Sequence, residues 1–144
     1  MAYPSLVYYQ TENEYQLHFE KIYCRAPVIT FDGIAVSFKK QDFNHAFFET
    51  VVKKDDTFSS KRAEKIDWIK AALKDPTSER YVGWNNKKKK YDYGRRVVLV
   101  MTNYVVVISI FKKDKARFVS AFVADSGRSL YMIRQNPKWT KKNR

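Results

Sequence analysis

A chain of 144 residues, 44% hydrophobic and 16% aromatic, can bury one core but is too short for two domains of ordinary size. Lys and Arg number 28 against 15 Asp and Glu, and a net charge of +13 favours anionic partners, with nucleic acid the commonest. No apolar run approaches the roughly 18 residues of a membrane span, no signal-peptide pattern opens the chain, and Cys24 stands alone, so we expect a cytoplasmic protein without a disulfide.

The first 40 residues give weak signals. Tyr15–Tyr23 and Val28–Phe38 alternate between apolar and polar residues, and Asp32–Gly33 is a turn dipeptide. This pattern predicts a short hairpin or an irregular lead-in. Residues 1–144 as a whole are expected to form a single domain, with a core over residues 41–135 and a loose basic tail over 136–144.

Two helices are predicted next. Asp42 can cap a helix that runs to about Val52. Ser59 or Ser60 can cap a second helix, which Pro76 ends. Apolar residues in this second segment recur at spacings of three and four: Ala63, Ile66, Ile69, Ala72 and Leu73.

After Pro76 the periodicity becomes that of strands. The predicted strands are Arg80–Trp84, Arg95–Thr102, Tyr104–Phe111 and Arg117–Ala124. The last three have short links and predict an antiparallel meander. A final helix is expected over Ser126–Gln135. Helices followed by a sheet indicate an α+β fold rather than a parallel sheet.

Basic residues gather in the second half of the chain. The segments are Lys87–Lys90, Arg95–Arg96, Lys112–Arg117, Arg128–Arg134 and Lys138–Arg144. Any single run is typical of a solvated loop. Together they favour a surface that binds a polyanion.

His45, Arg62 and Ser120 lie on three separate predicted elements of this cationic chain. An imidazole that titrates near neutral pH, together with cations that hold a phosphate, suits chemistry on a phosphodiester without a metal. The same residues could instead line an ordinary binding surface. His18, between alternating apolar residues, is interpreted as structural.

Four segments carry a family resemblance: FNHAFFE, FSSKRAEKIDWIKAAL, YVVVISIF and ARFVSAFVA. Between His45 and Val123 the chain resembles phage-encoded nucleases grouped with barnase, EndoU, colicin and RelE-like ribonucleases. The resemblance implies helices packed on one face of a four- to five-stranded antiparallel sheet. It also implies metal-independent RNA cleavage, in which the ribose 2′-hydroxyl attacks phosphorus and leaves a cyclic phosphate.

The resemblance also assigns roles. His45 becomes the candidate base or acid, Arg62 the phosphate clamp and Ser120 the orienting hydroxyl, with Tyr104 a weaker candidate. The residues expected to contact RNA are Trp84, Lys87, Lys88, Lys89, Lys90, Arg95, Arg96, Lys115 and Arg117. No cofactor or metal is expected, because the chain has no glycine-rich phosphate loop and no cysteine–histidine spacing, and Asp55–Asp56 lack a third carboxylate nearby.

The expected partners are RNA, either transfer or messenger, and an acidic antitoxin or immunity protein. Two alternatives remain open. One is a catalytically inert RNA- or DNA-binding accessory protein or virion component with the same fold. The other is an interaction domain whose basic face docks an acidic protein.

Overall fold

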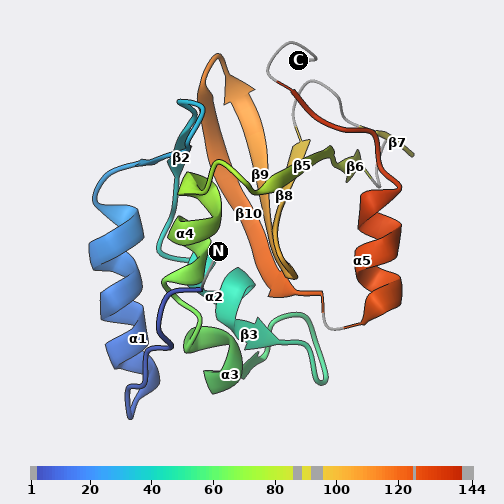
Figure 1. Ribbon diagram of the computed structural model, residues 1–144. Helices are drawn as coiled ribbons and strands as arrows, with labels where there is room; N and C mark the ends of the chain where they lie inside the picture. Colours follow the sequence, from blue (N-terminus) through green and yellow to red (C-terminus); the bar gives the residue numbers. More distant parts are fainter. Residues whose placement is uncertain (1–2, 86–88, 92–95, 125, 141–144) are drawn as a thin grey trace.

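One mixed sheet organises the molecule (Figure 1). The computed structural model describes residues 3–85, 89–91, 96–124 and 126–140, with the backbone alone for residues 84–85. Within these ranges, six strands pair in the order β1-β2-β10-β9-β8-β5. Their bounds are β1 (Val28–Ile29), β2 (Ala35–Ser37), β5 (Glu79–Val82), β8 (Arg96–Met101), β9 (Tyr104–Lys112) and β10 (Lys115–Val123).

The predicted α+β class is confirmed, and the sheet differs from the prediction in two respects. It has six strands in the described part of the chain, and β2 runs parallel to β10 while the other neighbours are antiparallel. The extra strands come from the hairpin predicted over residues 28–38. Gly33, whose φ of 89° lies in the left-handed region, turns that hairpin, and β2 then pairs with the edge of the meander.

Residues 15–23 were predicted to belong to a short hairpin or an irregular lead-in, and they form neither. The segment is α1 (Glu12–Phe19), which continues into a π-helical turn, η1 (Glu20–Cys24). Thr11 begins α1 with a capping box: its side chain accepts the Glu14 N–H, and the Glu14 carboxylate accepts the Thr11 N–H. Tyr15, Phe19 and Tyr23 are all buried. Their spacing of four places them on one helical face, which outweighs the weak alternation.

The middle helices are shorter than predicted. α2 (Asp42–Phe47) ends early because β3 (Phe48–Glu49) pairs with β4 (Thr57–Phe58). The second predicted helix divides into α3 (Ser60–Ala63) and α4 (Trp68–Lys74). Its predicted cap is present, since the Ser59 hydroxyl accepts the Arg62 N–H at 3.2 Å.

The two faces of the sheet carry different helices. One face, called here the front, packs against α1, α2 and α4 through buried side chains such as Phe19, Phe43 and Phe47. The back packs against α5 (Gly127–Arg134), whose Leu130 and Ile133 contact a smaller apolar cluster on β5, β8 and β9. The predicted C-terminal helix is confirmed, and it lies apart from the others at the right of Figure 1.

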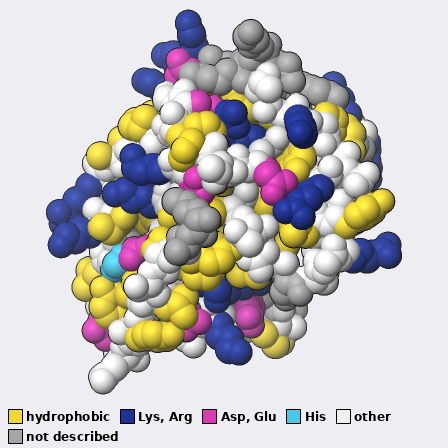
Figure 2. Space-filling model, in the orientation of Figure 1, with side chains coloured by type: hydrophobic (Ala, Val, Ile, Leu, Met, Phe, Trp, Pro, Cys, Tyr) yellow, Lys and Arg dark blue, Asp and Glu magenta, His cyan; other side chains and the backbone are white. Residues whose placement is uncertain are grey.

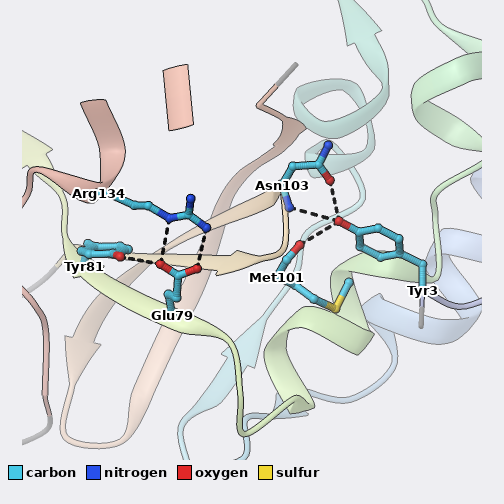
Figure 3. A network of polar contacts seen from close by, with 6 residues as sticks. All are labelled: Tyr3, Glu79, Tyr81, Met101, Asn103 and Arg134. Atoms are coloured by element: carbon cyan, nitrogen blue, oxygen red, sulfur yellow. Dashed lines mark hydrogen bonds and ion pairs between the residues drawn. The ribbon is translucent and has the colours of Figure 1, made fainter. Parts of the chain in front are cut away.

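The start of the described chain and the helix α5 are each tied to the sheet by hydrogen bonds (Figure 3). The Tyr3 hydroxyl donates to the Met101 carbonyl at 2.9 Å and accepts the Asn103 N–H at 3.1 Å. On α5, Arg134 donates two hydrogen bonds to Glu79, at 3.0 and 2.9 Å, and holds the pKa of that carboxyl below its usual range.

The basic tail is not loose over its first residues, which corrects the prediction. Residues 138–140 lie against β5, and a bridge pairs Lys138 with Tyr81. The Trp139 side chain is fully buried, and the backbone N–H of this residue donates to the Arg80 carbonyl at 3.1 Å. A second small hairpin, β6 (Trp84–Asn85) with β7 (Lys90–Tyr91), lies at the upper right of Figure 1.

Candidate phosphate-binding site

A pocket of about 190 Å³ opens on the front, where α2, β3 and α3 meet the first residue of β9 and the end of β10. Figure 2 shows Lys and Arg side chains beside acidic ones over the lower part of this face, where Figure 1 places α3 and β3. The pocket is lined by Ala46, Glu49, Lys61, Arg62, Lys65, Tyr104, Ala121, Phe122 and Val123. The lining therefore holds three cations and one carboxylate, and one of these cations, Lys65, is also paired with Glu64 at 3.7 Å.

Arg62 is held at the pocket by its neighbours. Its Nη1 donates to the Phe48 carbonyl at 2.8 Å, and its Nε lies 3.9 Å from Glu49 Oε1. The guanidinium carries five N–H donors, so these contacts leave further donors for a ligand. Its side chain is 40% exposed, which gives an anion access to it. A planar guanidinium in this setting can grip two phosphate oxygens at once.

Lys65 is also fixed in place. Its Nζ donates to the Lys61 carbonyl at 2.8 Å and lies 5.6 Å from the centre of the Trp68 ring. Trp68 is itself held by two aromatic rings. The Tyr3 ring stacks on it with 4.0 Å between ring centres, and the Tyr104 ring meets it edge-on with 5.5 Å between ring centres. The lysine therefore presents a positioned charge rather than a freely moving one.

Tyr104 supplies a neutral hydroxyl at the pocket. Its side chain is almost fully buried, and burial raises the pKa of the hydroxyl well above its usual value, while the nearby charge of Arg62 opposes this in part. The hydroxyl therefore stays protonated and uncharged at neutral pH. The structure thus brings together two of the four residues predicted to be catalytic, Arg62 and Tyr104.

His45 lies next to the pocket and not in its lining. It is on α2, one residue before Ala46, and its side chain is 42% exposed. Its Nδ1 is 3.2 Å from Asp55 Oδ2 in the loop that follows β3. The imidazole is therefore engaged with the β3–β4 loop, and its catalytic role stays a prediction.

Ser120 lies on the other face of the sheet. It pairs with Val107, which packs against the back cluster, whereas its neighbour Ala121 pairs with Val106 of the front core. Residues directly opposite each other in an antiparallel pair share a face. The Ser120 hydroxyl is thus not gathered with Arg62 and Tyr104.

Two of the predicted RNA-binding arginines share that back face. Ser109 pairs with Arg96 on β8 and with Arg117 on β10, so the three form one row across the sheet. Arg96 packs closely on Gly83, and its side chain fills the space that a Cβ at that position would need. Arg117 is exposed, with its guanidinium 4.8 Å from the Phe111 ring centre.

The remaining predicted RNA-binding residues lie away from the pocket or outside the described part of the chain. Lys89 and Lys90 are exposed at the β6–β7 hairpin, and Lys115 is exposed at the start of β10. Lys87, Lys88, Arg95 and the Trp84 side chain lie outside the described residues.

Sequence reasoning missed Glu49, Lys61 and Lys65 as pocket residues. Lys61 and Lys65 are four residues apart on either side of Arg62. This spacing is the pattern in the sequence that could have predicted a shared surface. Glu49 had no such signal, because it reaches the pocket through the β3–β4 pairing.

Among the described residues, no group of three or more His, Cys, Asp or Glu side chains is placed to hold a metal ion. The helices in the same part of the chain include none that is long and apolar enough to cross a membrane. Comparison with protein-family models, with curated proteins and with solved structures finds no match to this chain.

Proposed function

We propose that this protein binds single-stranded RNA and seats one backbone phosphate in the front pocket. The observation that carries the proposal is the convergence of Lys61, Arg62, Lys65 and Tyr104 on one small concavity. Cations and neutral donors are the groups that bind phosphate oxygens. The net charge of +13 adds long-range attraction for a polyanion.

Binding without cleavage is the function that this geometry supports best. The predicted combination of imidazole, guanidinium and alcohol is divided in the structure: Arg62 lines the pocket, His45 pairs with Asp55 beside it, and Ser120 lies on the opposite face. A phosphate held by Arg62 therefore has neither of the other two groups in the same pocket. This supports the accessory RNA-binding alternative.

The salt dependence of RNA affinity tests the proposal. We expect Lys61, Arg62 and Lys65 to neutralise the seated phosphate and its neighbours on the strand, three phosphates in all. The logarithm of the association constant should then fall with the logarithm of the salt concentration at a slope of about −2, from roughly −0.7 per neutralised phosphate of a single strand. The measurement is fluorescence anisotropy of a labelled eight-nucleotide RNA between low and moderate salt. Affinity that is absent, or that does not change with salt, would contradict RNA binding.

A metal-independent endoribonuclease is the second candidate, and Glu49 favours it. The Glu49 side chain is half exposed at the pocket and 3.9 Å from the Arg62 guanidinium. A carboxylate there could take the proton of a 2′-hydroxyl, while Arg62 stabilises charge on the phosphorus oxygens. His45, adjacent to Ala46, is then the candidate acid.

Cleavage assays in a chelator separate the two candidates. If the chain is an endoribonuclease, RNA products carry cyclic phosphate ends without added metal. Glu49→Gln and His45→Ala would each slow cleavage by about 10²- to 10⁴-fold while RNA binding persists. Ser120→Ala, on the opposite face, should cleave like wild type. Intact RNA after long incubation with the wild-type protein would remove the endoribonuclease candidate and leave RNA binding untouched.

A further inference from the structure

The loop of residues 50–56, between β3 and β4, presents two aliphatic side chains to solvent. Val51 is 66% exposed and Val52 is 89% exposed. Two exposed cations, Lys53 and Lys54, follow them directly. Single exposed apolar residues are common on protein surfaces, whereas an adjacent pair at the tip of a loop calls for a physical explanation.

This loop is held in shape by its own hydrogen bonds. The Asp56 carboxylate accepts the backbone N–H groups of Lys53, Val51 and Val52, each at 2.9 Å. These bonds hold the pKa of that carboxyl well below its usual range, so Asp56 is ionised at neutral pH. Thr50 Oγ1 accepts the Asp55 N–H at 3.1 Å.

A side-chain contact anchors the same loop to α2. Asp55 adopts a left-handed conformation with φ of 54°, and its carboxylate meets His45 Nδ1 at 3.2 Å. His45 thus acts in this structure as a link between α2 and the loop. The exposed valines are therefore presented by a preformed loop, and little ordering would be needed for them to bind a ligand.

The loop lies beside the phosphate pocket. Val51 follows the pocket residue Glu49 by two positions, so their Cα atoms are at most about 7 Å apart. The pocket volume of about 190 Å³ is below the range of roughly 300–1,000 Å³ typical of sites that enclose a whole small molecule. A nucleotide whose phosphate occupies the pocket must therefore place its base outside.

We propose that the 50–56 loop is the platform for that base. Val51 and Val52 pack against one face of an unpaired nucleobase, and Lys53 and Lys54 contact phosphates of the same strand. This inference rests on the proposed function and extends it, because it assigns the base to a surface separate from the phosphate pocket. Unpaired bases present flat apolar faces, which aliphatic side chains can cover.

An abasic oligonucleotide isolates the contribution of the base. We would measure the affinity of the protein for an eight-nucleotide single-stranded RNA and for a ribose-phosphate strand of equal length without bases. We expect wild type to prefer the RNA on the order of fivefold to tenfold, in line with the contribution of one stacked base. The double variant Val51→Ser with Val52→Ser should lose this preference and keep its affinity for the abasic strand.

Two further variants control this result. Leu17→Ser with Ile29→Ser removes two exposed apolar side chains elsewhere and should keep the preference for RNA. Asp56→Asn keeps both valines but weakens their backbone support, so we expect a smaller preference and faster amide exchange at Val51, Val52 and Lys53. Asp56→Asn also removes a negative charge, which affects binding of both strands alike. The ratio of the affinity for RNA to the affinity for the abasic strand cancels this effect.

The possible failures are distinguishable. If the valine double variant keeps the wild-type preference for RNA, the platform is wrong and the phosphate pocket stands. If it loses affinity for both strands equally, the loop supports the pocket and does not contact a base, which also overturns the inference. If wild type self-associates and the double variant does not, at unchanged RNA affinity, the valines form a protein interface instead. If wild type binds neither strand, the proposed function itself fails.

Discussion

Replacing Trp139 by alanine is expected to lower the free energy of unfolding by about 3–5 kcal/mol, the usual cost of emptying a buried aromatic site. The side chain is 2% exposed and belongs to the front core. Its backbone N–H donates to Arg80, and the Pro137 carbonyl accepts the Val82 N–H at 2.8 Å. Loss of the indole should therefore also release residues 138–140 from β5.

Guanidinium denaturation measures this loss, and two variants calibrate it. Trp139→Phe should be less damaging, since it keeps an aromatic ring and removes the indole N–H, a buried group that lacks a hydrogen-bond partner among the described residues. Met132→Ala, at an exposed position on α5, should change stability by no more than about 0.5 kcal/mol. A Trp139→Ala protein as stable as the Met132→Ala control would show that the tail is not part of the core.

Local hydrogen bonding made several elements predictable from the sequence. Ser59 and Ser126 were expected near helix starts, and each hydroxyl accepts an N–H three residues ahead. The last three predicted strands were expected to have short links, and β8 ends at Met101 while β9 begins at Tyr104. These features depend on neighbours along the chain, which is the information a single sequence carries.

Features that depend on distant residues were missed. Nothing local indicates that β2 runs parallel to β10, because the pairing joins residues about 80 positions apart. The tail was predicted to be loose as a basic segment at the end of the chain, yet Trp139 is buried against β5 by contacts across nearly 60 positions. In both cases tertiary packing outweighs the local pattern.

A one-residue β-bulge in β10 explains why Ser120 does not lie at the candidate site. Ala116 and Phe118 face the front core, and simple alternation would place Ser120 on that same face, with Arg62. A β-bulge between Phe118 and Ser120 inserts one residue, so Phe118 pairs with Ile108 but Ser120 pairs with Val107. A shift of one residue moves every later side chain to the other face. No pattern in the sequence predicted this bulge.

Replacing Arg62 by alanine is expected to weaken RNA binding by about 10- to 150-fold, the effect of losing a hydrogen bond to a charged group worth about 1.5–3 kcal/mol. The slope of log K against log salt should become shallower by about 0.7, because one fewer phosphate is neutralised. Anisotropy titrations at several salt concentrations give both quantities. Amide exchange at Phe48 and Glu49 would show whether loss of the 2.8 Å bond to the Phe48 carbonyl also loosens β3.

Two arginine variants separate the pocket from the overall charge of the protein. Arg62→Lys keeps the charge but cannot grip two oxygens in a plane, so its affinity should fall between those of wild type and Arg62→Ala, with the salt slope unchanged. Arg117→Ala removes the same charge from the back of the sheet and should leave affinity within about twofold of wild type, because screening limits distant exposed charges. Equal losses in Arg62→Ala and Arg117→Ala would mean that RNA responds to net charge or covers the back row of Arg96, Ser109 and Arg117. In that case the front pocket would not be the phosphate site.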